Sequence, residues 1–225
     1  MRFDDRAHAG RELARRLADV RPRPCVVGAI PRGGVAVGLP LAEALAIPLV
    51  AVNAHKLTSE FAPEFAFGAI DEDGEVLLDP ASVAQLGLGP GEIGAARRAA
   101  WACMRTRIER PREARLAAWL PGAAVLVDDG LATGLTMQAA VRYARRHGAF
   151  PIVVAAPCAS AEAARALESE ADRFVCPVVD PEFDAVGSYY VDFSQLTDEE
   201  TDALLARAAR DREVPPAGAS AGRES

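Results

Sequence analysis

Two adjacent acids followed by a turn rich in glycine and threonine are the residues of this chain best suited to chemistry. Asp128 and Asp129 follow an apolar run at 123–127, and a helical pattern begins at the end of the turn, at residue 136. Backbone N–H groups at a helix N-terminus, together with the helix dipole, favour the binding of a phosphate monoester. Carboxylates accept hydrogen bonds, so the two acids are suited instead to the vicinal hydroxyls of a ribose.

A second loop has the composition of an anion-binding site. Pro31, Arg32, Gly33 and Gly34 follow the apolar run at 25–30 and open the next helical pattern. The two glycines let the backbone come close to an anion, and the Arg32 guanidinium carries a permanent charge and forked donors.

One further cation stands near these loops in the sequence. Lys56 ends the next apolar run and is placed to reach the same anion as Arg32. The alternative interpretation is a solvated surface lysine, which is the usual state of this residue type.

The elements of the chain must bring these segments together. Apolar runs predict buried parallel strands at 25–30, 48–53, 123–127, 152–156 and 174–179. Helical patterns predict helices at 7–19, around 39–45, and at 92–108, 136–147, 161–167 and 198–210. This βαβ rhythm predicts an α/β fold with an open, mostly parallel twisted sheet flanked by helices, whose carboxyl edge gathers the ligand-binding loops.

Three other segments are less regular. Residues 54–91 contain many glycines and prolines, which predicts loops with short strands only at 67–70 and 76–78. Pro40 either opens its helix at the first turn or kinks it. Residues 211–225 are rich in Pro, Ala, Gly and Ser, so we expect one domain over residues 1–210 and a disordered tail after it.

Composition excludes several classes of protein. A chain of 225 residues with 50% hydrophobic and 25% charged residues suits one large domain. The formal net charge of −7 gives no basic field, which argues against a nucleic-acid partner. The four cysteines form no C-x-x-C pair and are interpreted as reduced thiols. Because no secretory signal and no membrane-spanning stretch is present, we expect a cytoplasmic protein with no membrane partner.

The acid pair and the turn after it resemble the fingerprint of type I phosphoribosyltransferases, which bind 5-phosphoribosyl 1-diphosphate (PRPP). The resemblance implies that Asp128 and Asp129 hold the ribose 2- and 3-hydroxyls of PRPP. It further implies that Ala132, Thr133, Gly134, Leu135 and Thr136 cradle the 5-phosphate. In the same family the loop at 31–34 grips the diphosphate, often through a cis peptide bond, here Pro31–Arg32.

The acceptor side of the resemblance is weaker. Residues 180–193 resemble the base-binding hood of 6-oxopurine phosphoribosyltransferases, with Phe183 stacking on the base. Asp192 would lie near the metal and reach it through water rather than directly. Core packing of the aromatic residues is the alternative interpretation. Residues 58–66 resemble a mobile lid, and Ala132 stands where the 6-oxopurine enzymes carry an acid.

Taken over residues 3–210, the chain resembles bacterial stand-alone phosphoribosyltransferase-domain proteins. The shared features include an opening that begins Asp5-Arg6 and an ending that reads Asp192-Phe193-Ser194-Gln195. The resemblance implies Mg²⁺-dependent transfer of a 5-phosphoribosyl group from PRPP to a nucleobase or related nucleophile, with release of diphosphate. The catalytic residues would be Arg32, Lys56, Asp128 and Asp129, in a family where homodimers are common.

Two alternatives from other classes stay open. A phosphoribosyltransferase fold can serve as a PRPP-binding regulator without catalysis. It can also serve as a phosphoribosyl hydrolase or phosphorylase, which would act without a base.

Overall fold

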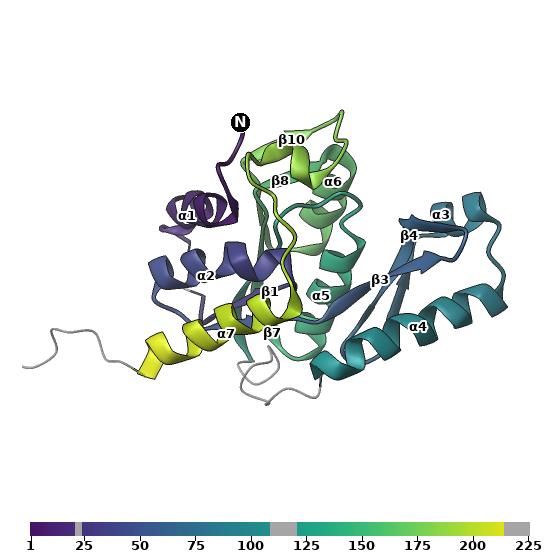
Figure 1. Ribbon diagram of the computed structural model, residues 1–225, viewed down its shortest axis with the longest axis horizontal. Coiled ribbons are helices and arrows are strands. Elements are labelled where there is room, and N and C mark those ends of the chain that lie inside the picture. The colour runs from purple at the N-terminus through teal and green to yellow at the C-terminus, as the bar shows by residue number, and fades with distance from the viewer. Residues whose placement is uncertain (21–23, 109–120, 214–225) are drawn as a thin grey trace, which may run out of the picture.

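A five-stranded parallel sheet with strand order β2-β1-β6-β7-β9 forms the centre of the fold (Figure 1). The structure is a computed structural model and describes residues 1–20, 24–108 and 121–213. The five strands are β1 (Val26–Ala29), β2 (Leu49–Ala51), β6 (Gly122–Val127), β7 (Ala149–Ala155) and β9 (Arg173–Val175). The predicted α/β fold with a mostly parallel sheet is therefore confirmed.

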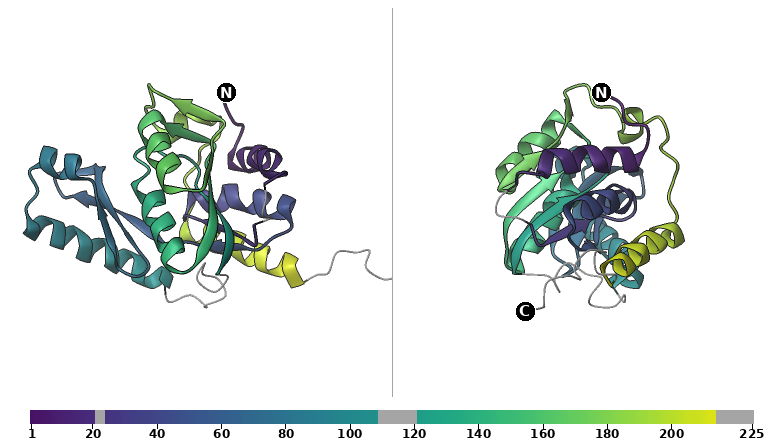
Figure 2. Two further views of the ribbon diagram at one scale, coloured as in Figure 1. Left: turned by 180° about the vertical axis from the view of Figure 1, so that it is seen from behind. Right: turned by 90° about the vertical axis from the view of Figure 1, so that its left-hand side faces the viewer.

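Helices cover both faces of this sheet, as the two views of Figure 2 show. One face carries α1 (Arg6–Leu17), α2 (Gly33–Leu45) and α7 (Asp198–Glu213), and the other carries α5 (Leu135–Arg146) and α6 (Ala161–Glu170). Val27 and Val125 are buried with side chains of α1 and α2, whereas their neighbours Val26 and Leu126 are buried with side chains of α5 and α6. Burial on both faces explains why the strands read as continuous apolar runs.

Pro40 lies inside α2 rather than at its start. Because α2 begins at Gly33, the interpretation of Pro40 as a first-turn residue is wrong. Helix α1 lies against α2 here: a Cβ on Gly10 would be 2.2 Å from the carbonyl oxygen of Val37 and 2.6 Å from the Pro40 ring. The missing side chain at Gly10 thus lets the two helix backbones touch, which fixes the position of α1 over the sheet.

The chain between β2 and β6 builds a second layer, which we call the arm (residues 54–108) and which projects from the sheet in Figures 1 and 2. Its elements are β3 (Ala54–Ser59), β4 (Ala62–Asp71), β5 (Val76–Leu78), α3 (Pro80–Leu86) and α4 (Pro90–Ile108). The short strands expected at 67–70 and 76–78 are confirmed as parts of β4 and β5, whereas the expectation that the rest of 54–91 is loop is wrong. The strands pair antiparallel, and Leu57, Phe67 and Ile70 are buried with Ala100 and Met104 of α4.

The segment that resembles a mobile lid, residues 58–66, is a β-hairpin in this structure. The pairing of β3 with β4 continues from Leu57 opposite Gly68 to Ser59 opposite Ala62, with shifts of register on either side of Thr58. Phe61 at the turn is 86% exposed. The hairpin is thus formed with an apolar ring at its tip open to solvent.

A small structure that we call the hood (residues 178–196) lies at the end of the last strands. It consists of β10 (Val178–Asp180), which pairs in parallel with β8 (Cys158–Ser160), followed by a 3₁₀-helix (Val186–Tyr189) and an extended segment. The single strand predicted at 174–179 is split into β9 and β10. Pro177 stands between the two strands and has no N–H to offer a ladder.

The first residues of the chain pair with the hood. Phe3 forms a parallel bridge with Tyr190, its N–H donates to the carbonyl of Tyr189 over 2.8 Å, and both rings are buried. The N-terminal segment therefore joins a part of the molecule that comes nearly 190 residues later, at Tyr190.

The last helix, α7, runs to Glu213. The first residues of the predicted disordered tail are thus helical, and residues 214–225 lie outside the described residues. Over the described ranges, no helix is both long enough and apolar enough to pass through a bilayer. The four cysteines, all of which lie within those ranges, form no disulfide bond.

Candidate active site

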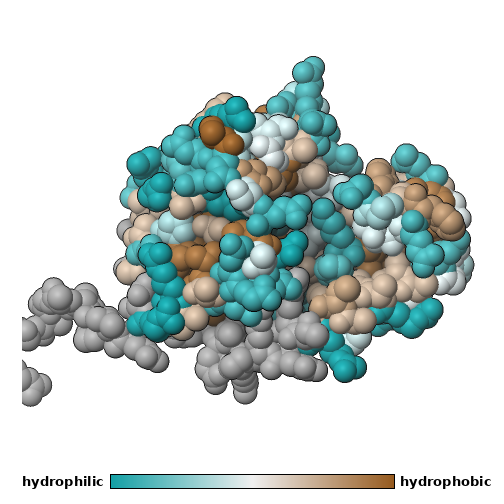
Figure 3. Space-filling view, viewed as in Figure 1, coloured by the Kyte–Doolittle hydropathy of each residue, from teal (hydrophilic) through white to brown (hydrophobic). Residues whose placement is uncertain are grey.

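The two loops singled out in the sequence meet at the point where the strand order of the sheet reverses. Strand β1 pairs with β2 on one side and with β6 on the other, so the connections that follow β1 and β6 leave in opposite directions. A crevice forms at such a point, beyond the carboxyl ends of the strands. The crevice here is a cleft of about 590 Å³. Figure 3 shows the molecule hollowed between the sheet and the arm, with hydrophilic residues along the hollow.

Most of the predicted site residues line this cleft. Those that do are Pro31, Arg32, Gly33, Lys56, Asp128, Asp129, Ala132, Thr133, Gly134 and Thr136. Gly34, Leu135, Phe183 and Asp192 do not. The structure thus brings the acid pair, the threonine-glycine turn, Arg32 and Lys56 to one place.

The turn after β6 is hydrogen-bonded to β8. The Leu131 N–H donates to the carbonyl of Cys158 and the Leu131 carbonyl accepts from the Ser160 N–H, each over 2.9 Å. The Ser160 hydroxyl donates to the carbonyl of Ala132 over 2.6 Å. Gly134 has a positive φ of 73°, which favours glycine, and it caps α5. The turn is therefore held open toward the cleft with the N-terminus of α5 at its end.

Leu135 faces away from the cleft. Its side chain is buried with Ala54, Ala66, Ala69 and Ala139, where it joins the arm to α5. The structure thereby gives a packing reason for a large residue at this position, since its side chain fills the contact between two layers.

The glycine loop after β1 packs directly on the acid pair. The Pro31–Arg32 peptide bond is cis, as the resemblance predicts. A Cβ on Gly33 would lie 1.8 Å from Asp129 Oδ2, and a Cβ on Gly34 would lie 2.7 Å from the carbonyl oxygen of Val127. Only glycines let the two loops approach so closely, which makes them one site.

Asp128 is an acid with an unusual environment. Its Oδ1 accepts a hydrogen bond of 2.8 Å from the Asp129 N–H. Burial, followed by the charge of Asp129, raises the pKa of Asp128 well above its ordinary value, and the charge of Lys56 acts in the opposite direction. An acid with a raised pKa next to a second carboxyl group in a cleft is typical of a functional site.

We expect Asp128→Asn to stabilise the fold at neutral pH. A carboxyl group whose folded-state pKa is raised contributes stability only below its unfolded pKa, and that contribution is lost as pH rises through the folded pKa. At pH 7.5 the variant should therefore melt higher, by roughly 2–4 °C if the gain is about 1 kcal/mol, and at pH 4 the gain should shrink. Thermal unfolding at the two pH values measures this. Asp129→Asn, which loses an ion pair, is the control and should melt no higher than the parent. An Asp128→Asn variant that melts lower than the parent at pH 7.5 would show that the Asp128 carboxyl does not destabilise the fold.

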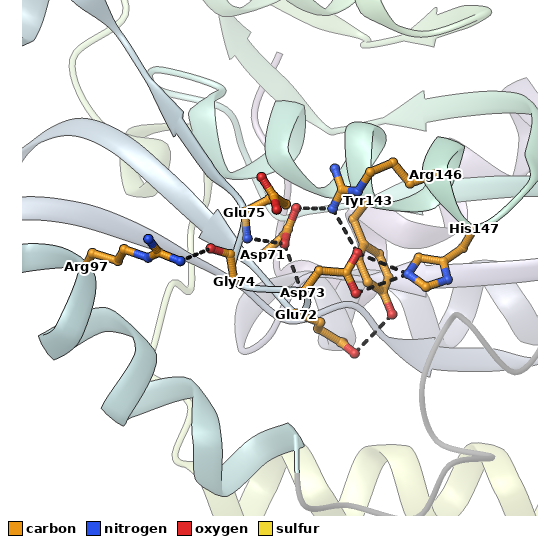
Figure 4. A network of polar contacts seen from close by, with 9 residues as sticks. All are labelled: Asp71, Glu72, Asp73, Gly74, Glu75, Arg97, Tyr143, Arg146 and His147. Atoms are coloured by element: carbon orange, nitrogen blue, oxygen red, sulfur yellow. Dashed lines mark hydrogen bonds and ion pairs between the residues drawn. The ribbon is translucent and has the colours of Figure 1, made fainter. Parts of the chain in front are cut away.

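A network of polar contacts fixes the arm, and with it Lys56, against the last turns of α5 (Figure 4). Arg146 pairs with Asp71 over 2.6 Å and with Asp73 over 3.0 Å, and His147 lies 3.1 Å from Asp73. The Tyr143 hydroxyl donates to Glu72 over 3.2 Å. Helix α5, which begins at the turn after β6, thus ends against the arm.

Phe183 and Asp192, which the resemblance to the hood implies lie at the base and near the metal, do not line the cleft. Phe183 stacks on Tyr189, with ring centroids 5.0 Å apart and an interplanar angle of 20°. The Asp192 side chain is exposed and accepts a 3.0 Å hydrogen bond from the Ser194 N–H. Neither side chain is brought to the cleft, so neither is in place there to contact a base.

Other residues line the cleft that the sequence does not assign to a site, among them Arg6, Val186, Gln195 and Leu196. The Asp5-Arg6 opening and the ending with Gln195 are features shared with the resembled proteins, but nothing in their spacing indicates that they meet the acid pair. The Arg6 Nε donates to Asp129 Oδ2 over 2.8 Å, and the Arg6 side chain is only 12% exposed.

The chain is similar to known proteins over most of its length. The family model described as a phosphoribosyl transferase domain matches residues 4–193. Two Mycobacterium tuberculosis proteins, provisionally named phosphoribosyl transferases, are 42% identical over 93% of this chain. The chain spans about half of their length, 47%. The crystal structure of TT1426 from Thermus thermophilus is 40% identical, with a TM-score of 0.74 over 92% of this chain and 99% of that one. The family-model match over residues 4–193 and the relatives at 40% and 42% identity place this chain in the phosphoribosyl transferase domain family.

Proposed function

We propose that the protein transfers a 5-phosphoribosyl group from PRPP to a nitrogenous base or related nucleophile and releases diphosphate, in a Mg²⁺-dependent reaction. The observation that carries the proposal is the meeting of the acid pair, the phosphate turn and the Arg-Gly-Gly loop in one cleft. Each of the three has the chemistry of one part of PRPP.

One half of the cleft has groups suited to the ribose 5-phosphate end of PRPP. The N-terminus of α5, with the backbone N–H groups of residues 132–136, favours the doubly charged phosphate. Asp128 and Asp129 accept from the ribose hydroxyls, which turns the sugar so that its reactive carbon points to the Arg32 side of the cleft. Binding at two ends of the sugar fixes the direction of the bond that breaks.

The part of the cleft proposed to bind the diphosphate contains two cationic side chains. Arg32 and Lys56 line the cleft on the side of the glycine loop, and both side chains are exposed to a ligand. As the C1–O bond breaks, positive charge develops on the ribosyl ring and negative charge on the leaving diphosphate. Groups already held in place stabilise that charge without reorganising, which is the largest contribution a protein can make to such a step.

The cleft fits a magnesium ion that arrives with the substrate. Asp128 and Asp129 offer the hard oxygen atoms that Mg²⁺ prefers, and among the described residues no group of three or more His, Cys, Asp or Glu is gathered to hold a metal by itself. An ion here would take its ligands mostly from diphosphate, ribose and water, near the oxygen atoms of the acid pair. When bound, Mg²⁺ neutralises part of the charge on the leaving group.

The acceptor would enter from the side of the hood. Val186, Gln195 and Leu196 line the cleft there, and they offer apolar surface and one amide to a flat ring. The two residues expected to bind the base, Phe183 and Asp192, lie outside the lining. We therefore place the acceptor against Val186 and Gln195.

The experiment that tests the proposal is a turnover assay with PRPP, Mg²⁺ and a panel of purine and pyrimidine bases, which follows diphosphate release and nucleotide formation. Nucleotide formation with one of the bases supports the transferase. Binding of PRPP without turnover on the whole panel would favour the regulator, and release of diphosphate or ribose phosphate without any base would favour the hydrolase or phosphorylase.

Arg32→Gln is expected to lower kcat by roughly 10- to 100-fold. A hydrogen bond to a charged group contributes about 1.5–3 kcal/mol, and the negative charge that Arg32 faces grows as the bond breaks. Steady-state kinetics with saturating PRPP measures the effect. Arg165→Gln, at an exposed position of α6 away from the cleft, removes the same charge and should leave kcat unchanged. Equal kcat in Arg32→Gln and the parent would show that Arg32 does not act on the leaving group.

A further inference from the structure

Arg6 joins the acid pair to the hood. It is the first residue of α1, and its guanidinium makes contacts in three directions. Nε donates to Asp129 Oδ2 over 2.8 Å, Nη1 donates to the Ser194 carbonyl over 2.8 Å, and the group lies 3.9 Å from the centre of the Phe193 ring. One side chain thus links the loop after β6 to the extended end of the hood.

The surroundings of Arg6 hold it in that position. The Val191 N–H donates to the Phe3 carbonyl and the Asp192 N–H to the Asp4 carbonyl, each over 2.8 Å. Asp5 then caps α1 by accepting from the His8 N–H over 2.6 Å. The backbone of Arg6 is therefore held between the segment that pairs with the hood and the capped first turn of α1.

The hood holds Asp129 a second time, through its backbone. The Tyr190 hydroxyl donates to the Asp129 carbonyl oxygen over 2.6 Å, and the Tyr190 ring is buried beside Phe3. Asp129 is thus fixed at its main chain by Tyr190 and at its carboxylate by Arg6, while Gly33 packs on the carboxylate from the opposite loop.

A carboxylate that must accept from a sugar diol needs a fixed orientation. Each of its oxygens has two acceptor positions, so the single bond from Arg6 to Oδ2 leaves Oδ1 and one position of Oδ2 for hydroxyl groups. Without a partner the Asp129 side chain is free to rotate about its side-chain bonds, and ordering it would weaken each binding event. The Arg6 contact removes that freedom before the sugar arrives.

We infer that Arg6 is a positioning residue, which orients the Asp129 carboxylate for the ribose hydroxyls of PRPP and ties that orientation to the hood. The inference rests on the proposed function. Since Asp129 contacts the diol both before and during the reaction, the loss of Arg6 should raise the Kd and KM for PRPP and change kcat little. A merely structural role would lower the melting temperature without this division between KM and kcat.

The chain supplies a matched control in Arg2. Its Nε donates to the Tyr190 carbonyl over 3.0 Å, so Arg2 also ties the N-terminal segment to the hood, yet it does not contact Asp129. Calorimetric titration with PRPP and Mg²⁺ should give a Kd about 10- to 30-fold higher for Arg6→Gln and within about twofold of the parent for Arg2→Gln, as expected for one charged hydrogen bond. Arg6→Lys, which keeps the charge but not the fork of donors, should fall between them and serves if Arg6→Gln does not fold.

A double-mutant cycle separates the inference from the function on which it rests. In an Asp129→Asn background, Arg6→Gln should cost no more than about twofold in PRPP affinity, because the carboxylate that Arg6 positions is gone. Equal PRPP affinity in Arg6→Gln and the parent, or fully additive losses in the cycle, overturns the role of Arg6 while the proposed function stands. A parent protein that does not bind PRPP at all overturns the proposed function, and the role of Arg6 with it.

Discussion

The double variant Asp128→Asn/Asp129→Asn is expected to bind PRPP about 10²- to 10⁴-fold more weakly than the parent. Each carboxylate would accept from a ribose hydroxyl, and a hydrogen bond to a charged group contributes about 1.5–3 kcal/mol. Two such bonds sum to about 3–6 kcal/mol, and every 1.4 kcal/mol is a factor of ten in affinity. Asparagine keeps the size of the side chains but presents one acceptor oxygen instead of two.

Calorimetric titration with PRPP and Mg²⁺ measures this loss. The matched control is Glu162→Gln/Glu168→Gln, which removes two exposed acids from α6 and gives the same change in net charge away from the cleft. Because Asp129→Asn also loses its ion pair with Arg6, a melting curve of the double variant must show that it is folded at the temperature of the titration. A double variant that bound and consumed PRPP normally would refute the role of the acid pair.

Gly33→Ala is expected to weaken PRPP binding about 100-fold through a purely steric effect. The added methyl carbon would lie 1.8 Å from Asp129 Oδ2 and 2.3 Å from its Cγ, so the carboxylate must move. Arg6 holds that carboxylate from the other side, and the backbone of Gly33 is part of the glycine loop. The substitution therefore disturbs both the ribose side and the diphosphate side of the cleft at once.

The same titration measures the Gly33→Ala loss, with Gly91→Ala as its control. Gly91 lies in the first turn of α4, where a Cβ would meet no atom within 4 Å, so alanine there should leave PRPP affinity unchanged. A crystal structure of Gly33→Ala should show a displaced Asp129 side chain. Normal PRPP affinity in this variant would mean that the carboxylate is not needed where Gly33 leaves room for it.

The central sheet was predictable from the sequence because burial on both faces leaves a simple signal. Strands β1 and β6 consist of short runs of small and branched apolar residues, and a turn containing glycine follows each of them. The helices between them were visible by their apolar spacing. The fold class therefore followed from local pattern alone.

The arm was not predictable in the same way. One face of its strands packs on α4 and the other packs in part on α5, and a glycine interrupts the pattern: Gly68 lies in β4, where a Cβ would be 2.4 Å from the Leu77 carbonyl oxygen. In a sequence such a glycine reads as a turn, whereas here it permits a close approach of two strands. Tertiary packing, rather than local sequence pattern, therefore determines where the strands of the arm form.

In the site, too, the local patterns were predictable and the contacts between distant segments were not. The acid pair and the glycine loop were found because each is contiguous and precedes a helix. Arg6 and Gln195 were not assigned roles, since they reach the cleft from opposite ends of the chain and from elements whose meeting no local pattern reveals. The contact of Phe183 was not predictable for a similar reason: its ring packs on Tyr189 and does not line the cleft.

The pairing of the first residues with the hood sets an order of events during synthesis on the ribosome. When residue 175 has emerged, the residues of all five parallel strands are present, yet Arg6 still lacks Ser194, a partner 188 positions later. Contacts so distant along the chain close last, after the domain has begun to collapse. A nascent chain would thus complete its sheet before Arg6 can contact the hood.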